Sequence, residues 1–208
     1  MIQIENLNLT IRKTEILKGI CLELEDGKIH GLIGRNGSGK TMLMKCICGF
    51  VRPTSGTIKV NGKYVGKDLD FPQDLGVIIE NPAFLPHLSG FANLQLLAKA
   101  RKRIGDAEIY QVMERLSLDP GNRLPVRKYS LGMKQRLGIA QAIMEMPSLL
   151  VLDEPMGALD EEGVRDVRRI LLELKQQGTT ILLSSHNAED IRMLCDTSHR
   201  LQKGKLAV

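Results

Sequence analysis

The chain has 208 residues, of which 43% are apolar, and this balance is typical of a globular protein with a sizeable core. No apolar run approaches the ~20 residues that span a bilayer, and residues 1–5 do not resemble a secretion signal, so a cytoplasmic protein is expected. The net charge is +5, but basic and acidic residues are interspersed and only 3% of residues are aromatic, which argues against nucleic acid as a partner.

Strand-like and helix-like segments alternate along the chain, and this alternation predicts an α/β domain with a largely parallel sheet. The predicted elements, in chain order, are strands at 2–9, 16–24 and 28–33, a helix at 41–49, strands at 57–60 and 76–79, helices at 91–102, 106–116 and 131–146, a strand at 149–152, a helix at 161–177, a strand at 180–184 and a helix at 187–195. Asn61-Gly62 predicts a tight hairpin turn. The mainly helical stretch from Gly90 to Met146 is interpreted as an insertion into one α/β core.

A glycine-rich loop, Gly-Arg-Asn-Gly-Ser-Gly-Lys-Thr at 34–41, follows a predicted strand and opens a predicted helix, which is the context of a P-loop. Its glycines let the backbone curl so that N–H groups converge on phosphates. Lys40 would carry a charge to the β- and γ-phosphates, and the Thr41 hydroxyl can ligate Mg²⁺. The predicted nucleotide-binding residues here are Gly34, Arg35, Asn36, Gly37, Ser38, Gly39, Lys40, Thr41 and Met42.

Two carboxylates end an apolar strand at 149–154, Leu-Leu-Val-Leu-Asp-Glu. A buried parallel strand delivers its last residues to the carboxyl edge of the sheet, beside the phosphate loop. Asp153 is suited to hold Mg²⁺, directly or through water. Glu154 is suited to polarise the attacking water.

With these two elements joined, the chain resembles an ABC-transporter nucleotide-binding domain over nearly its whole length. The most specific support is Tyr-Ser-Leu-Gly-Met-Lys-Gln-Arg at 129–136, which resembles the family signature LSGGQ. Ser130 and Gly132 lie at the start of a predicted helix, where a hydroxyl and free N–H groups make an anion site. The resemblance implies that this site meets the γ-phosphate held by another cassette, so that ATP is sandwiched in a dimer.

The remaining motifs follow in the family's order. Asp160 resembles the D-loop residue that crosses the dimer interface, and His186 matches the switch histidine that contacts the γ-phosphate. With Lys40 and Glu154, His186 completes the expected catalytic set. The implied fold is a P-loop NTPase (RecA-like) parallel-sheet core with an N-terminal antiparallel β subdomain and an inserted α-helical subdomain. One ABC ATPase domain, 1–208, is expected, with a core at 1–80 and 147–208 and a helical signature subdomain at 81–146.

Two positions depart from the family pattern. Glu80 stands where the family usually has a glutamine that reaches the metal and senses the membrane subunit. A glutamate there can still ligate Mg²⁺ but adds negative charge near the phosphates. Residues 80–94 resemble the bacterial branch that exports bacitracin-like and lantibiotic peptides. Ile11 takes the place of the aromatic residue that often stacks on adenine, which predicts weaker base discrimination.

The resemblance implies an ATP-hydrolysing subunit that powers transport through a separate integral membrane permease, with export of an antimicrobial peptide or other antibiotic as the favoured cargo. It would be peripheral on the inner face of the cell membrane and would work as a homodimer or heterodimer with ATP and Mg²⁺. One alternative is a soluble ABC ATPase acting as an assembly factor, of the iron–sulfur type. A degenerate regulatory cassette is disfavoured because Lys40, Asp153, Glu154 and His186 are all present.

Overall fold

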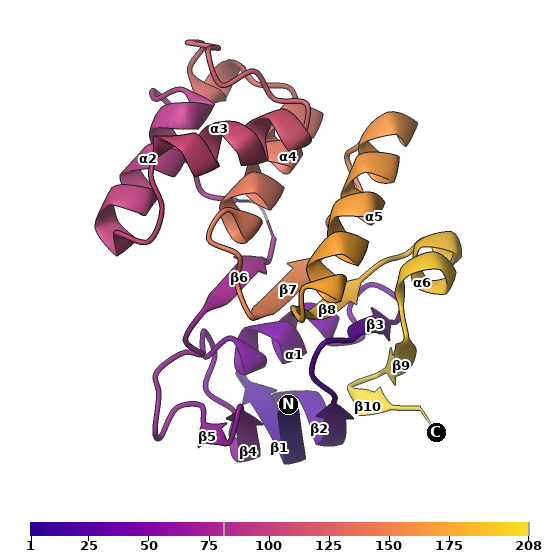
Figure 1. Ribbon diagram of the computed structural model, residues 1–208. Coiled ribbons are helices and arrows are strands. Elements are labelled where there is room, and N and C mark those ends of the chain that lie inside the picture. The colour runs from indigo at the N-terminus through magenta and orange to yellow at the C-terminus, as the bar shows by residue number, and fades with distance from the viewer. Residues whose placement is uncertain (81, 208) are drawn as a thin grey trace.

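Two β-sheets form the base of the molecule in the computed structural model, which describes residues 1–80 and 82–207 (Figure 1). The smaller sheet is antiparallel and is built from the first part of the chain. Its strands, in spatial order, are β2 (Thr14–Leu24), β1 (Ile2–Ile11), β4 (Ser55–Val60) and β5 (Lys63–Tyr64). Asn61 and Gly62 join β4 to β5 with φ of 50° and 78°, the positive values that the predicted hairpin turn requires.

The larger sheet is parallel except at one edge, where the last strand pairs antiparallel to its neighbour. Its spatial order is β10 (Lys205–Leu206), β9 (Thr197–Gln202), β3 (Ile29–Ile33), β8 (Thr180–Ser184), β7 (Leu149–Asp153) and β6 (Leu75–Ile78). Because the central strands are parallel, their carboxyl ends meet at one edge, and the loops that follow β3, β7 and β8 gather there.

The central strands are apolar throughout because both faces of the sheet are covered. Leu150 and Leu152 of β7 pack in one core with helices on the far side from the small sheet. Leu149 and Val151 point the other way, into a second core shared with α1 and the antiparallel sheet. The helices are α1 (Lys40–Ile47), α2 (Gly90–Arg101), α3 (Asp106–Arg115), α4 (Leu131–Ile143), α5 (Glu161–Gln176) and α6 (Ala188–Leu194), with a short 3-10 helix at Val126–Lys128.

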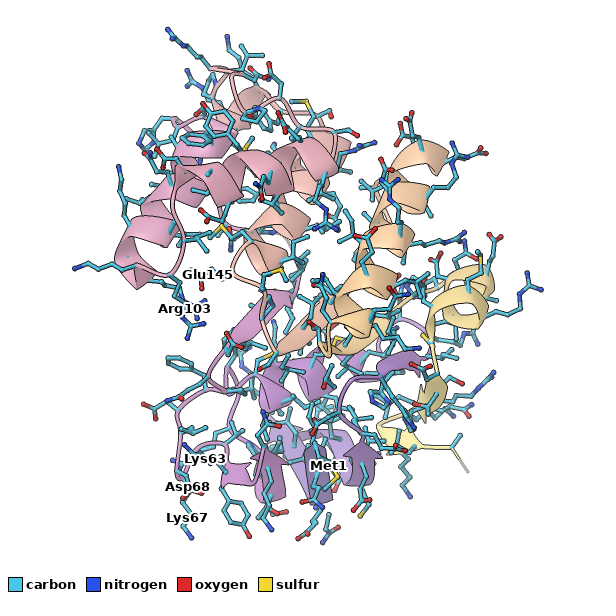
Figure 2. All side chains as sticks on the ribbon, viewed as in Figure 1. Met1, Lys63, Lys67, Asp68, Arg103 and Glu145 are labelled. Atoms are coloured by element: carbon cyan, nitrogen blue, oxygen red, sulfur yellow. The ribbon has the colours of Figure 1, made fainter. Side chains whose placement is uncertain are left out.

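Helices α2, α3 and α4 form a group of their own beyond β6 (Figure 1). At its junction with the sheets, Arg103 lies 2.5 Å from Asp74, and Arg101 lies 3.0 Å from the buried carboxylate of Glu145. Figure 2 shows Arg103 and Glu145 close together there. The Arg103–Asp74 pair ties the end of α2 to the segment before β6, and the Arg101–Glu145 pair ties it to the segment after α4. The predicted boundary of the helical insertion at Asn81 lies outside the described residues.

The predicted elements are present with small shifts at their ends. The exception in length is α4, which stops at Ile143 because the chain turns before Pro147 and Met146 takes a left-handed φ of 52°. Strands β5, β9 and β10 were not predicted. Strand β9 alternates exposed and half-buried polar residues, so it carries no apolar run to reveal it. No helix in the described part of the chain has both the length and the apolar character that a membrane span requires.

Candidate nucleotide-binding and catalytic site

The glycine-rich loop connects β3 to α1, and its backbone takes conformations that favour glycine. Gly39 precedes α1 with a φ of 109°, and no side chain caps the first turn of that helix. Gly34 lies so close to β9 that a Cβ would sit 2.4 Å from the Leu201 carbonyl oxygen. Lys40 is buried and donates from Nζ to the Gly34 carbonyl at 2.7 Å. The Lys40 side chain therefore folds back over the glycine-rich loop.

Two hydroxyl groups hold the carboxylate of Asp153. Thr41 Oγ1, from the first turn of α1, donates to Asp153 Oδ2 at 2.6 Å. Ser184 Oγ, from the end of β8, donates to Asp153 Oδ1 at 2.6 Å. The parallel register pairs Asp153 directly with Ser184, which explains why the second hydroxyl lies in reach. Asp153 and Thr41, both predicted as metal ligands, thus lie side by side.

Glu154 and His186 meet at the ends of β7 and β8. The Glu154 backbone is left-handed, with a φ of 51°, and its N–H donates to Ser184 Oγ at 3.0 Å. Glu154 Oε2 accepts from the backbone N–H of His186 at 3.1 Å, and His186 Nε2 lies 3.1 Å from Glu154 Oε1. A carboxylate and an imidazole are therefore paired within reach of the phosphate loop.

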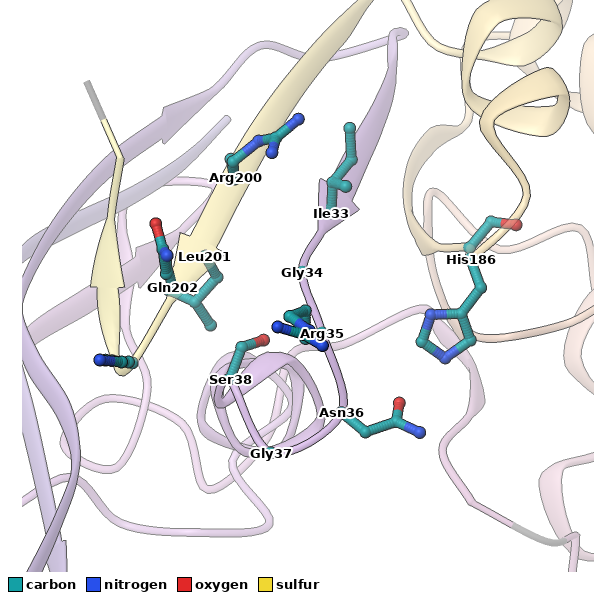
Figure 3. Close-up of a pocket in the computed structure, with 12 residues that line it drawn as sticks. Ile33, Gly34, Arg35, Asn36, Gly37, Ser38, His186, Arg200, Leu201 and Gln202 are labelled. Atoms are coloured by element: carbon teal, nitrogen blue, oxygen red, sulfur yellow. The ribbon is translucent and has the colours of Figure 1, made fainter.

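A cavity of about 930 Å³ lies beside this loop, a size suited to a small ligand. It is lined by residues 33–38, Ser185, His186, Arg200, Leu201, Gln202 and Lys203. Figure 3 shows the P-loop running between the β9 side chains and His186. Arg35 of the loop, Arg200 of β9 and Lys203 of the turn after β9 give the cavity positive charge, which suits a polyphosphate. Arg200 and Lys203 were not predicted, because neither β9 nor the turn that follows it was predicted.

The loop fits the nucleotide that its motif implies. The Ser38 hydroxyl is buried and has no hydrogen-bond partner among the described residues. The first turn of α1 has no side-chain cap, so its N–H groups are available to an anion. The Thr41 and Asp153 oxygens are the ligand type that Mg²⁺ prefers.

The signature segment contacts the D-loop of its own chain. Ser130 caps α4 by accepting from the Met133 N–H at 3.1 Å. Asp160 caps α5, and Arg136 Nη2 donates to its carboxylate at 2.8 Å. The Gly163 N–H and the Arg136 guanidinium hold the pKa of Asp160 below its usual range. A Cβ on Gly132 would contact the Ala158 carbonyl oxygen at 3.2 Å.

No hydrogen bond in residues 1–80 and 82–207 joins the signature helix to the P-loop. Ser130 and Gly132 are also not among the residues that line the cavity beside the P-loop. Gln135 Nε2, on the same helix, donates to the Pro155 carbonyl at 2.7 Å and ties the signature helix to the segment after Glu154.

Three further predicted residues do not line the cavity. Glu80 has a left-handed φ of 61° and pairs with Lys45 of α1, Oε1 to Nζ, at 2.7 Å. Ile11 ends β1 half-exposed and does not line the cavity. Met42 is half-buried in α1 and packs toward the core shared with the antiparallel sheet. Their roles in metal or nucleotide binding stay predictions.

The loop, the strand-end carboxylates and the parallel sheet define a P-loop nucleotide-binding protein. Residues 17–157 match the family model described as ABC transporter. The chain is 47% identical over 206 residues to the uncharacterized ABC transporter ATP-binding protein YybJ of Bacillus subtilis, covering 99% of this chain and 94% of that one. It therefore belongs to the ABC transporter ATP-binding family.

Two other relatives are named for the compounds that they help to transport. The bacitracin transport ATP-binding protein BcrA of Enterococcus faecalis is 40% identical over 99% of this chain and 68% of its own length. The lantibiotic transport ATP-binding protein SrtF of Streptococcus pyogenes is 35% identical over 99% of this chain and 89% of its own. These similarities confirm the family and the transport-powering ATPase, and they do not favour the assembly-factor alternative.

Solved structures share the fold. The dimeric ATP-binding cassette MJ0796, in a post-hydrolysis state bound to ADP and Pi, superposes with a TM-score of 0.90 over 100% of this chain and 97% of that one, at 20% identity. A further structure, of the ATP-binding subunit of an ABC transporter, gives 0.88 at 26% identity, over 100% of this chain and 88% of that one. The predicted α/β fold class is confirmed.

Proposed function

We propose that this ABC ATPase hydrolyses Mg²⁺-bound ATP with Lys40, Thr41, Asp153, Glu154 and His186 in the roles predicted from the motifs. The observation that carries the proposal is the pairing of Glu154 with His186, at 3.1 Å, next to the Asp153–Thr41 hydrogen bond. Asp153 accepts hydrogen bonds from two hydroxyls, whereas Glu154 faces the imidazole of His186. The two acids are thus separated into a metal-holding role and a water-activating role.

The P-loop N–H groups and Lys40 bind the β- and γ-phosphates. Thr41 and Asp153, with Glu80 as a further candidate, would hold Mg²⁺, which neutralises phosphate charge when bound. Glu154 orients a water molecule and accepts its proton as the water oxygen attacks the γ-phosphorus. The bond from that phosphorus to the ADP oxygen breaks, and ADP and inorganic phosphate leave. His186 contacts the γ-phosphate and keeps Glu154 in place.

A second cassette completes the site. Ser130 and Gly132 do not line the cavity beside the P-loop of their own chain, and with Asp160 they would contribute to the site of a partner cassette. The first turn of α4 offers the N–H groups that would meet a γ-phosphate there. The partner is a second copy of this chain or a related cassette.

The cargo is proposed to be an antimicrobial peptide or other antibiotic, exported through a separate membrane permease. The similarity to bacitracin and lantibiotic transport proteins supports this, together with Glu80 in place of the usual glutamine. The chain would then sit at the inner face of the cell membrane, held there by the permease. Purification from native membranes tests this: a polytopic membrane protein should co-purify, and an exclusively soluble complex contradicts transport.

The catalytic proposal is tested by Glu154→Gln, with Glu114→Gln as the matched control on the exposed face of α3. Removing the base should lower turnover by about 100-fold or more while leaving ATP binding intact. In the presence of ATP and Mg²⁺, the variant should then accumulate as a dimer in size-exclusion chromatography. Persistent monomer with bound ATP would contradict the sandwich arrangement, and wild-type turnover in Glu154→Gln would contradict the role of Glu154.

A further inference from the structure

A buried ion pair joins α5 to α6 close to the catalytic histidine. Arg168 of α5 donates to Asp190 Oδ1 from Nε at 3.0 Å and from Nη2 at 2.5 Å. Only 13% of the arginine side chain and 4% of the aspartate side chain are exposed. Asp190, together with Glu189, raises the pKa of the guanidinium. Because burying two charges is costly, a pair in this position calls for a reason beyond stability.

The second oxygen of Asp190 holds the loop that carries His186. Ser185 Oγ donates to Asp190 Oδ2 at 2.8 Å, in a buried contact. The same hydroxyl accepts from the Asn187 N–H at 3.1 Å. The two neighbours of His186 are therefore tied to one hydroxyl, and that hydroxyl is anchored on the buried carboxylate.

The anchored loop turns His186 toward Glu154. Its backbone N–H donates to Glu154 Oε2 and its Nε2 faces Oε1, so the position of the loop decides both contacts. The His186 side chain is 53% exposed, and among residues 1–80 and 82–207 its imidazole makes a polar contact with Glu154 only. Its orientation thus depends on what fixes the backbone at 185–187.

We propose that Arg168, Asp190 and Ser185 are positioning residues for hydrolysis, which lock the 185–187 backbone so that His186 meets Glu154. The proposal rests on the proposed role of His186. Arg168 orients the Asp190 carboxylate, Asp190 fixes the Ser185 hydroxyl, and that hydroxyl fixes the loop. Arg168 and Asp190 do not line the cavity beside the P-loop, and Ser185, which does, directs its hydroxyl to Asp190 and to the Asn187 N–H.

Ser185→Ala is the decisive variant because it cuts the link to the loop and leaves the buried ion pair in place. Turnover per nucleotide-binding molecule should fall about tenfold, because small misplacement of a catalytic group has large kinetic cost. The Kd for ATP should stay within about twofold, since the P-loop is untouched. Ser185→Thr keeps the hydroxyl and should restore turnover. Amide exchange at 186 and 187 should accelerate in the alanine variant only.

Two further variants and a control separate positioning from stability. Asp190→Asn preserves shape but leaves the buried Arg168 charge without its full partner, so it should lower stability, and turnover per nucleotide-binding molecule should show the same loss as in Ser185→Ala. Arg169→Met, on the same helix but 65% exposed and paired with Asp166, should behave as wild type. Wild-type turnover in Ser185→Ala, or a loss matched by an equal loss of nucleotide-binding molecules, would overturn the proposal. If His186→Ala itself turns over normally, the proposed role of His186 fails instead.

Discussion

Ser184 offers a test of how the two carboxylates are held. Its hydroxyl is fully buried, donates to Asp153 Oδ1 at 2.6 Å and accepts from the Glu154 N–H at 3.0 Å. Ser184→Ala removes both hydrogen bonds and leaves Asp153 Oδ1 and the Glu154 N–H without this partner. The bond to the charged Asp153 contributes about 1.5–3 kcal/mol, and the bond from the backbone N–H about 0.5–1.5 kcal/mol. The free energy of unfolding should therefore fall by about 2–4.5 kcal/mol.

The same substitution should weaken Mg²⁺-dependent ATP binding, because Asp153 loses the hydroxyl that orients one of its oxygens. By analogy with other groups that orient metal ligands, a loss of about tenfold is expected. Denaturant unfolding and a Mg²⁺ titration of ATP binding measure the two effects. Ser198→Ala is the control, since that serine is exposed on β9. A stability change below about 0.5 kcal/mol, the range of an ordinary surface substitution, would refute the reasoning.

Three further predictions concern the charge of Glu80, the choice of nucleobase and the pH dependence of stability. Glu80→Gln should strengthen ATP binding measured without Mg²⁺, because a negative charge near the phosphates is removed; unchanged affinity would argue against its placement there. With Ile11 in place of an aromatic residue, ATP and GTP turnover should be similar, and a strong preference for ATP contradicts that prediction. Burial and the charge of His30 lower the pKa of His199, so the unfolded chain binds more protons below pH ~6.5. The free energy of unfolding should therefore fall as pH drops below that value. His199→Asn should make the free energy of unfolding less dependent on pH in this range.

The sequence by itself determined the motifs and most of the elements. The P-loop is one continuous segment, and its conformation is set by glycines at positions with positive φ, such as Gly37 and Gly39. Strands β7 and β8 were predictable because burial on both faces makes them short apolar runs. Strand β9 was not, because it contributes mainly through backbone pairing with β3 and carries polar side chains.

The tertiary structure alone decided which side chains meet. Thr41 and Asp153 are 112 residues apart in the chain, and Ser184 is 31 residues from Asp153, yet all three form one hydrogen-bonded group. Those meetings depend on the parallel register of β7 and β8 and on the packing of α1 against the sheet, which no local pattern encodes. The Arg168–Asp190 pair likewise required α5 and α6 to be placed side by side. Local chemistry therefore indicated the reaction, whereas strand register and helix packing set the geometry of its groups.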